Sequence, residues 1–202
     1  MKMVIDKILD VDKKILLFLT IICIIGFITG SIYMTVLSPN DKNMIISSID
    51  EFITGYGQLN SKIELINNLV INISYLLVIW ILGISLLGLP SVIIVLFIKS
   101  FLLSFTVASF IMKYKYKGIL LGIIYNIPHN IINLILYIYV GIYSINISSF
   151  IIKSVIHKKE LNFKNAFSRY LVILALALFL LLITTLYETF CMPYFINKII
   201  KI

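Results

Sequence analysis

Long apolar runs separated by short polar segments dominate the chain. Residues 15–36 form the first run, which contains no charged residue. Four more follow, at residues 69–87, 92–112, 118–152 and 171–192. About 20 consecutive apolar residues allow an α-helix to cross the ~30 Å hydrocarbon core of a bilayer. The pattern therefore predicts an all-α, polytopic transmembrane bundle of about five spans.

The fourth run is too long for one straight span. Residues 118–152 would form a helix of roughly 53 Å at 1.5 Å per residue. Pro128 interrupts this run, because proline lacks an N–H donor and disfavours α geometry at Ile127. We therefore expect a half-helix up to Ile127 and a full span from about Pro128 to Ile152. Six spans is the alternative, if both halves cross.

The polar segments define the expected organisation. Residues 37–67 are the longest polar stretch, with a turn and helix-start signal at residues 38–41. We expect one or two surface helices there, too small to hold a core of their own. The expected divisions are a cytoplasmic amphipathic segment (1–14), the first span (15–36), an extracytoplasmic loop (37–67), a membrane bundle with the Pro128 break (68–152), a basic cytoplasmic loop (153–170), and the last span and tail (171–202).

Composition supports the membrane interpretation. The 202 residues are 61% hydrophobic and 13% charged, with a mean hydropathy of +1.09. Soluble domains are about half apolar and about a quarter charged, which excludes a soluble globular domain and a disordered chain. The net charge of +8 comes from 17 basic and 9 acidic residues, and Arg169 is the one arginine. Because nucleic-acid binders favour arginine forks, lysines beside apolar runs indicate a membrane and not a nucleic acid.

The basic residues also suggest an orientation. Residues 1–14 and 153–169 hold nine of the 17 basic residues, and basic loops favour the cytoplasmic side. Five spans place both segments in the cytoplasm and the C-terminus outside. The same topology leaves the lysines of residues 113–117 outside, against the rule, so the asymmetry is modest.

Candidate catalytic and cofactor-binding residues are scarce. Cys23 and Cys191 are isolated in apolar surroundings, and His129 and His157 lie on different segments. The sequence has no Cys-x-x-Cys or His-Glu-x-x-His pattern and no phosphate-binding loop. We therefore expect no catalytic residue, no metal site and no cofactor.

Two groups of polar residues inside the apolar runs are candidate functional features. In the simplest interpretation of the first, Lys99 snorkels and Glu188 reaches the interface. A structural Lys99–Glu188 pair and a coupling-ion site are the alternatives. The second group is Asn126, Pro128, His129 and Asn130. These side chains can satisfy the amides that the proline frees, which we prefer, or a broken helix can bind a substrate.

Glycines indicate close packing between helices. Two pairs lie four residues apart, a spacing that lets membrane helices approach closely. Two further glycines flank the end of the second run. The predicted helix-packing residues are Gly26, Gly30, Gly83, Gly88, Gly118 and Gly122.

Several short motifs follow one another in a characteristic order. They are the Gly26/Gly30 pair, Gly83-x-Ser85-x-x-Gly88-x-Pro90, Phe97-x-Lys99-Ser100-Phe101, Ile127-Pro128-His129-Asn130, and Glu188 followed by Pro193. Over essentially the whole chain this order resembles the stage II sporulation protein M family. Ser100 and Ser104 stand where that family would lead us to expect glycine, and they keep a small side chain.

The resemblance implies a non-enzymatic integral membrane scaffold in the septal or engulfing membrane of a sporulating cell. Its partners would be peptidoglycan-degrading proteins, namely the stage II sporulation proteins P and D, which it recruits during engulfment. Ile49, Phe52 and Tyr56 in the external loop are the expected partner contacts. Membrane lipid is a further expected partner, a homo-oligomer is left open, and no nucleic acid is expected.

A second function remains open at this stage. Lys99, Glu188 and the Pro128 break are the kinds of feature that a permease uses. The alternative is therefore a permease-like membrane subunit built around these residues.

Overall fold

The computed structural model of the chain describes residues 12–55, 61–85, 88–157, 163–192 and 194. Within these ranges the chain is helical and contains no strand. The elements are α2 (Lys13–Val36), α3 (Pro39–Gly55), α4 (Ser61–Gly83), α5 (Gly88–Tyr114), α6 (Tyr116–Asn126), the π-helical turn η1 (Ile127–Ile131), α7 (Ile132–His157) and α8 (Phe163–Phe190). The expected all-α class is confirmed.

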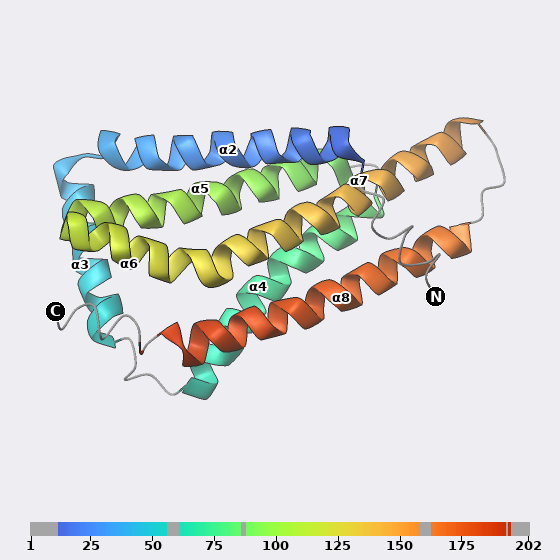
Figure 1. The fold of residues 1–202 in the computed structure, drawn as a ribbon. Coiled ribbons are helices and arrows are strands. Elements are labelled where there is room, and N and C mark those ends of the chain that lie inside the picture. Colours follow the sequence, from blue (N-terminus) through green and yellow to red (C-terminus); the bar gives the residue numbers. More distant parts are fainter. Residues whose placement is uncertain (1–11, 56–60, 86–87, 158–162, 193, 195–202) are drawn as a thin grey trace.

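Five helices of the described part are long and apolar enough to cross a membrane. They are Lys13–Val36, Lys62–Gly83, Gly88–Tyr114, Pro128–Ile152 and Phe167–Phe190. In Figure 1 these helices extend between the same two ends of the bundle, with α4 oblique to α2 and α5, and α3 lies across one end. The start of α2, the end of α7 and the start of α8 lie at the opposite end. The five candidate spans therefore each connect the two ends of the bundle, in agreement with the five apolar runs of the sequence.

Most helices extend beyond the apolar runs that predicted them. α4 begins at Ser61, although its apolar run begins at residue 69. α8 likewise begins at Phe163, so much of the basic segment 153–170 is helical. A helix satisfies its own backbone groups, so it can continue from hydrocarbon into the interface. Residues 1–11, most of the expected amphipathic segment, lie outside the described residues.

The Pro128 break takes the form of a π-helical turn. α6 contains 11 residues, and η1 then leads directly into α7. A π-turn absorbs the missing proline hydrogen bond by a local change of register, so the helix bends and continues. At about 1.5 Å per residue, α6 is too short to cross a membrane alone. Six spans are therefore not present in the described part of the chain.

α5 and α6 form a tight helical hairpin through one residue, Lys115. This residue adopts a left-handed conformation with φ 50°, and its N–H donates to the Ile111 carbonyl at 2.8 Å. Such a residue ends a helix by satisfying a late carbonyl. Gly118 then lies against the backbone of Phe110, where a Cβ atom would fall within 3.0 Å of it. The hairpin therefore needs glycine at this position.

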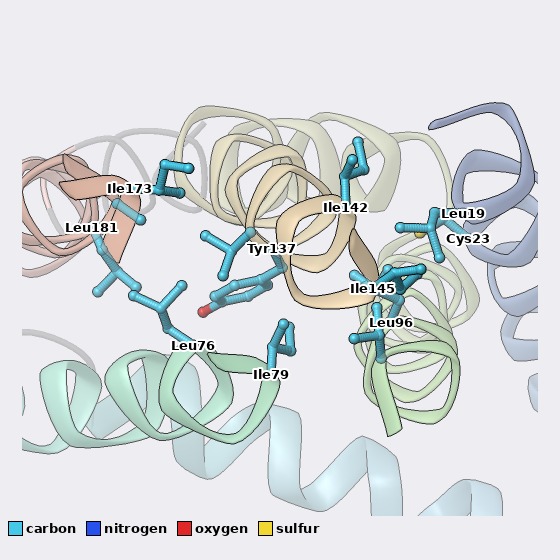
Figure 2. Close-up of a cluster of buried hydrophobic side chains, with 13 residues drawn as sticks. Leu19, Cys23, Leu76, Ile79, Leu96, Tyr137, Ile142, Ile145, Ile173 and Leu181 are labelled. Carbon is cyan, nitrogen blue, oxygen red and sulfur yellow. The ribbon is translucent and has the colours of Figure 1, made fainter. Parts of the chain in front are cut away.

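α7 lies at the centre of the bundle. Buried apolar side chains from α2, α4, α5 and α8 surround it, as Figure 2 shows. The Tyr137 ring points from α7 toward Leu76 of α4, while Ile142 and Ile145 face the side of α2 and α5. Many large apolar side chains of the outer helices are exposed, including Ile28 and Phe179. An apolar exterior of this extent fits a protein whose solvent is lipid.

Small residues join α2 to α5. A Cβ atom on Gly26 or Gly30 would lie within 3.0 Å of α5 backbone atoms at Phe97 or Phe101. The hydroxyls of Ser100 and Ser104 occupy the same contacts, and Ser104 donates to the Phe27 carbonyl at 2.5 Å. Ser100 and Ser104 therefore lie where α2 and α5 approach closely enough for backbone contact.

Gly30→Ala should weaken the α2–α5 contact, because the added methyl group meets the rigid Phe101 carbonyl. We expect the free energy of unfolding to fall by about 1–3 kcal/mol, the range for overpacking. Thermal unfolding of the detergent-solubilised protein measures it. Gly122→Ala is the matched control, since its Cβ would come nearest to a Val107 methyl group, at 3.0 Å, and would lie 3.6 Å from the backbone. Equal stability losses in the two variants would contradict the assigned contact.

Candidate functional site

Polar side chains from three elements meet at Glu188, near the end of α8. The His129 Nε2 atom of η1 lies 3.4 Å from Glu188 Oε1. The Asn72 Nδ2 atom of α4 donates to Glu188 Oε2 at 3.5 Å. The side chains of His129 and Glu188 are 1% and 12% exposed. The carboxylate is therefore enclosed by groups that can stabilise its negative charge.

Asn72 connects this carboxylate to the centre of the bundle. The Tyr137 hydroxyl donates to the Asn72 main-chain oxygen at 3.0 Å and approaches its Oδ1 atom at 3.5 Å. The ring of Tyr137 also packs against Tyr75, with centroids 6.2 Å apart. Sequence reasoning did not single out Asn72 or Tyr137. The signal that could have found them is an amide and a phenol inside otherwise apolar spans.

Lys99 lies over aromatic rings and makes no direct ion pair with Glu188. Its Nζ atom is 4.5 Å from the Tyr75 ring centroid and 5.9 Å from that of Tyr137. Such cation–π contacts stabilise an ammonium group away from water. Tyr137 and Asn72 nevertheless connect the two charged groups, because the Tyr137 ring lies beside Lys99 and its hydroxyl bonds to Asn72, which donates to Glu188. We call Asn72, Tyr75, Lys99, His129, Tyr137 and Glu188 the buried polar cluster.

Two polar side chains near Pro128 contact α8. His129 points toward α8 through its contact with Glu188, and Asn130 is half-buried. Asn126 ends α6, and its side chain lies outside the described part. One helical turn further, Asn133 accepts a hydrogen bond from Thr184 of α8 at 2.6 Å. The break thus brings polar side chains of two consecutive turns against α8.

A second set of polar contacts joins α4, α7 and α8 nearer the opposite end. The Ser144 hydroxyl donates to the Ile79 carbonyl at 3.0 Å and contacts the Tyr170 hydroxyl at 2.6 Å. Tyr170 also donates to the Trp80 carbonyl at 2.8 Å and stacks on its indole. Gly83 faces Ser144 and Tyr170, where a Cβ would overlap both. These contacts fix the relative positions of three helices.

Gly88 begins α5 and faces the side chain of Ser148 on α7. Ser148 in turn donates to the Ser85 carbonyl at 2.9 Å. Gly83, Ser85 and Gly88 therefore all contact serine side chains of α7, which sequence reasoning did not anticipate.

α3 packs its apolar face against the bundle. Ile49 is half-buried and contacts a small core of Phe110, Leu121 and Met192. Lys113 of α5 pairs with Asp50 and donates to the Ile46 carbonyl at 2.9 Å. Of the expected partner contacts, Ile49 thus faces the chain itself. The side chain of Phe52 and the whole of Tyr56 lie outside the described residues.

The geometry of the buried polar cluster favours interhelical stabilisation. No group of three His, Cys, Asp or Glu side chains in the described part is arranged to bind a metal ion. The hydrogen bonds of the cluster run between helices of the chain. Its ionisable groups could also hold a proton or an ion, which is the chemistry that a transport role would use.

Removing one of the two opposite charges in the cluster should destabilise the bundle, because the remaining charge is then uncompensated inside the apolar bundle. We expect Glu188→Gln and Lys99→Met each to lower the free energy of unfolding, and the double variant to lose about 1 kcal/mol less than the sum. Chemical unfolding of the solubilised variants measures this coupling. Lys99→Met combined with Asp41→Asn, an exposed position of α3, is the control and should be additive. Additivity in both pairs would contradict the interaction.

Comparison with protein-family models identifies the chain. The model described as Stage II sporulation protein M matches residues 15–193. Comparisons with curated proteins and with solved structures gave no match. The matched range includes four of the five candidate spans in full, all but the first two residues of the span Lys13–Val36, and the buried polar cluster. The chain therefore belongs to the stage II sporulation protein M family.

Proposed function

We propose that this protein is a non-enzymatic membrane scaffold that recruits peptidoglycan-degrading proteins to the septal membrane during engulfment. The observation that carries the proposal is the family match over residues 15–193. By the same argument the partners are the stage II sporulation proteins P and D, and the site of action is the septal or engulfing membrane of the sporulating cell.

The architecture supports a scaffold because the bundle is internally fixed. Close glycine contacts join α2 to α5 and α6 to α5. Hydroxyl contacts join α4, α7 and α8. A fixed bundle can hold an external element in a defined position for a partner. α3 is such an element, because its Ile46 carbonyl and Asp50 carboxylate are held by Lys113.

The outward face of α3 is the best-supported contact surface in the described part. With Ile49 turned toward the bundle, the opposite face carries Met44, which is 68% exposed, and the exposed Ser47. Methionine is enriched at protein interfaces, where its flexible side chain adapts to a partner. The proposed contact surface is therefore the face of α3 opposite Ile49.

Met44→Arg combined with Ser47→Arg should reduce partner recruitment without removing the protein from the membrane. We expect at least a tenfold loss of both peptidoglycan-degrading proteins in pull-downs from sporulating cells, because two arginines disrupt an apolar contact. Tyr116→Arg is the control for an added arginine outside α3, since this residue begins α6 and is 86% exposed. Undiminished capture would exclude α3 as the contact surface. Failure of the unmodified protein to capture either partner would exclude the proposed function.

The buried polar cluster supports one alternative, a permease-like subunit. Lys99, His129 and Glu188 place ionisable groups inside spans, as transporters do. In that case Glu188→Gln should reduce solute or proton flux into proteoliposomes at least tenfold. The scaffold function predicts no flux with either protein, and partner capture unaffected by Glu188→Gln.

A further inference from the structure

A groove of about 570 Å³ lies between α2 and α5 on the outside of the bundle. We call it the α2–α5 groove. It is lined by Phe27, Ser31 and Thr35 of α2, Ala108 and Ile111 of α5, and Lys42 of α3, together with neighbouring apolar side chains. Phe27 and Ile111 are 43% and 39% exposed, so the groove opens to the surroundings of the bundle.

The position of the groove places it in one leaflet of the bilayer. All its lining residues except Lys42 belong to two of the candidate spans. From Phe27 to Thr35 the groove extends about 12 Å at 1.5 Å per residue. One leaflet contributes about 15 Å of hydrocarbon. The groove therefore runs from the interface toward the bilayer centre, as a lipid acyl chain does.

The polar atoms of the groove are used within the chain. Ser31 donates to the Phe27 carbonyl at 3.1 Å, and Thr35 donates to the Ile32 carbonyl at 2.7 Å. Hydroxyls bonded to their own helix leave the methyl and methylene groups to line the space. The interior of the groove thus suits a hydrocarbon ligand.

Lys42 gives the groove a charged mouth. Its Nζ atom donates to the Thr35 carbonyl at 2.8 Å, at the end of α2. An ammonium group has three donors, so two remain for a ligand. Lys113 of α5 is by contrast paired with Asp50. The exposed Lys115 and Lys117 lie in or beside the α5–α6 turn and do not line the groove.

We propose that the α2–α5 groove binds one anionic phospholipid, with an acyl chain between α2 and α5 and its phosphate at Lys42. The groove is apolar and about one leaflet deep, which suits an acyl chain. The ammonium group of Lys42 lies at its end, where it can bind the phosphate. Zwitterionic phospholipids share the acyl chain but carry a compensating positive charge, so the site favours a net negative headgroup.

Native mass spectrometry of the full chain, released from nanodiscs of equal phosphatidylglycerol and phosphatidylethanolamine, tests the proposal. We expect one phosphatidylglycerol to remain bound. Lys42→Gln should weaken this binding about fivefold, which corresponds to about 1 kcal/mol for one lysine at an anionic surface. Lys117→Gln, an equal loss of charge outside the groove, should change binding less than twofold.

Filling the groove separates acyl-chain binding from simple charge attraction. Ala108→Phe should abolish lipid retention, whereas Ala175→Phe, at an exposed position of α8, should leave it intact. Circular dichroism verifies that both variants fold. Equal retention of both phospholipids, or lipid binding unaffected by Ala108→Phe, would overturn the proposal. A dimer that forms without bound lipid and is lost in Ala108→Phe would also overturn it, because a second copy would then occupy the groove.

Discussion

The burial of Glu188 is the constraint on which the arrangement of α4, α7 and α8 depends. A carboxylate inside a bilayer is costly unless the protein supplies partners. Here the partners come from α4 and η1, through Asn72 and His129. These helices are distant in sequence, so the carboxylate can be satisfied only when they assemble. An apolar contact between the same helices would gain little, because lipid is equally apolar.

The π-turn at Pro128 makes this arrangement possible. A regular helix from α6 into α7 would need the hydrogen bond that the proline cannot donate. The π-turn removes that demand and changes the rotation of the residues that follow. His129 then reaches Glu188, and Asn133 reaches Thr184 one turn later. The π-turn thus positions the side chains through which η1 and α7 pack against α8.

Sequence patterns predicted the number of spans because length and hydropathy alone decide whether a helix can cross. Glycines are visible in the sequence as missing side chains, and in the structure Gly26 and Gly30 lie against backbone atoms of α5. Sequence patterns could not predict which partner Glu188 meets, because that depends on how helices are rotated about their axes. Lys99 accordingly lies over Tyr75, and His129 takes the place next to the carboxylate. The same limit applies to Ile49. Apolar residues along one face of a helix do not reveal whether that face meets the rest of the chain or a partner, and here Ile49 meets the chain.

The α2–α5 contact differs in kind from the contacts around Glu188. It depends mainly on the absence of side chains at Gly26 and Gly30. Because these glycines lack a Cβ, the α2 backbone can lie against the backbone of α5 and the hydroxyls of Ser100 and Ser104. Met34, one turn further along α2, is buried and accepts a hydrogen bond from Ser109 of α5. Beside this contact, Ser31 and Thr35 of α2 and Ala108 of α5 line the α2–α5 groove, with Lys42 among its lining residues. A lipid bound in the groove would touch both helices, so it would reinforce the contact between α2 and α5.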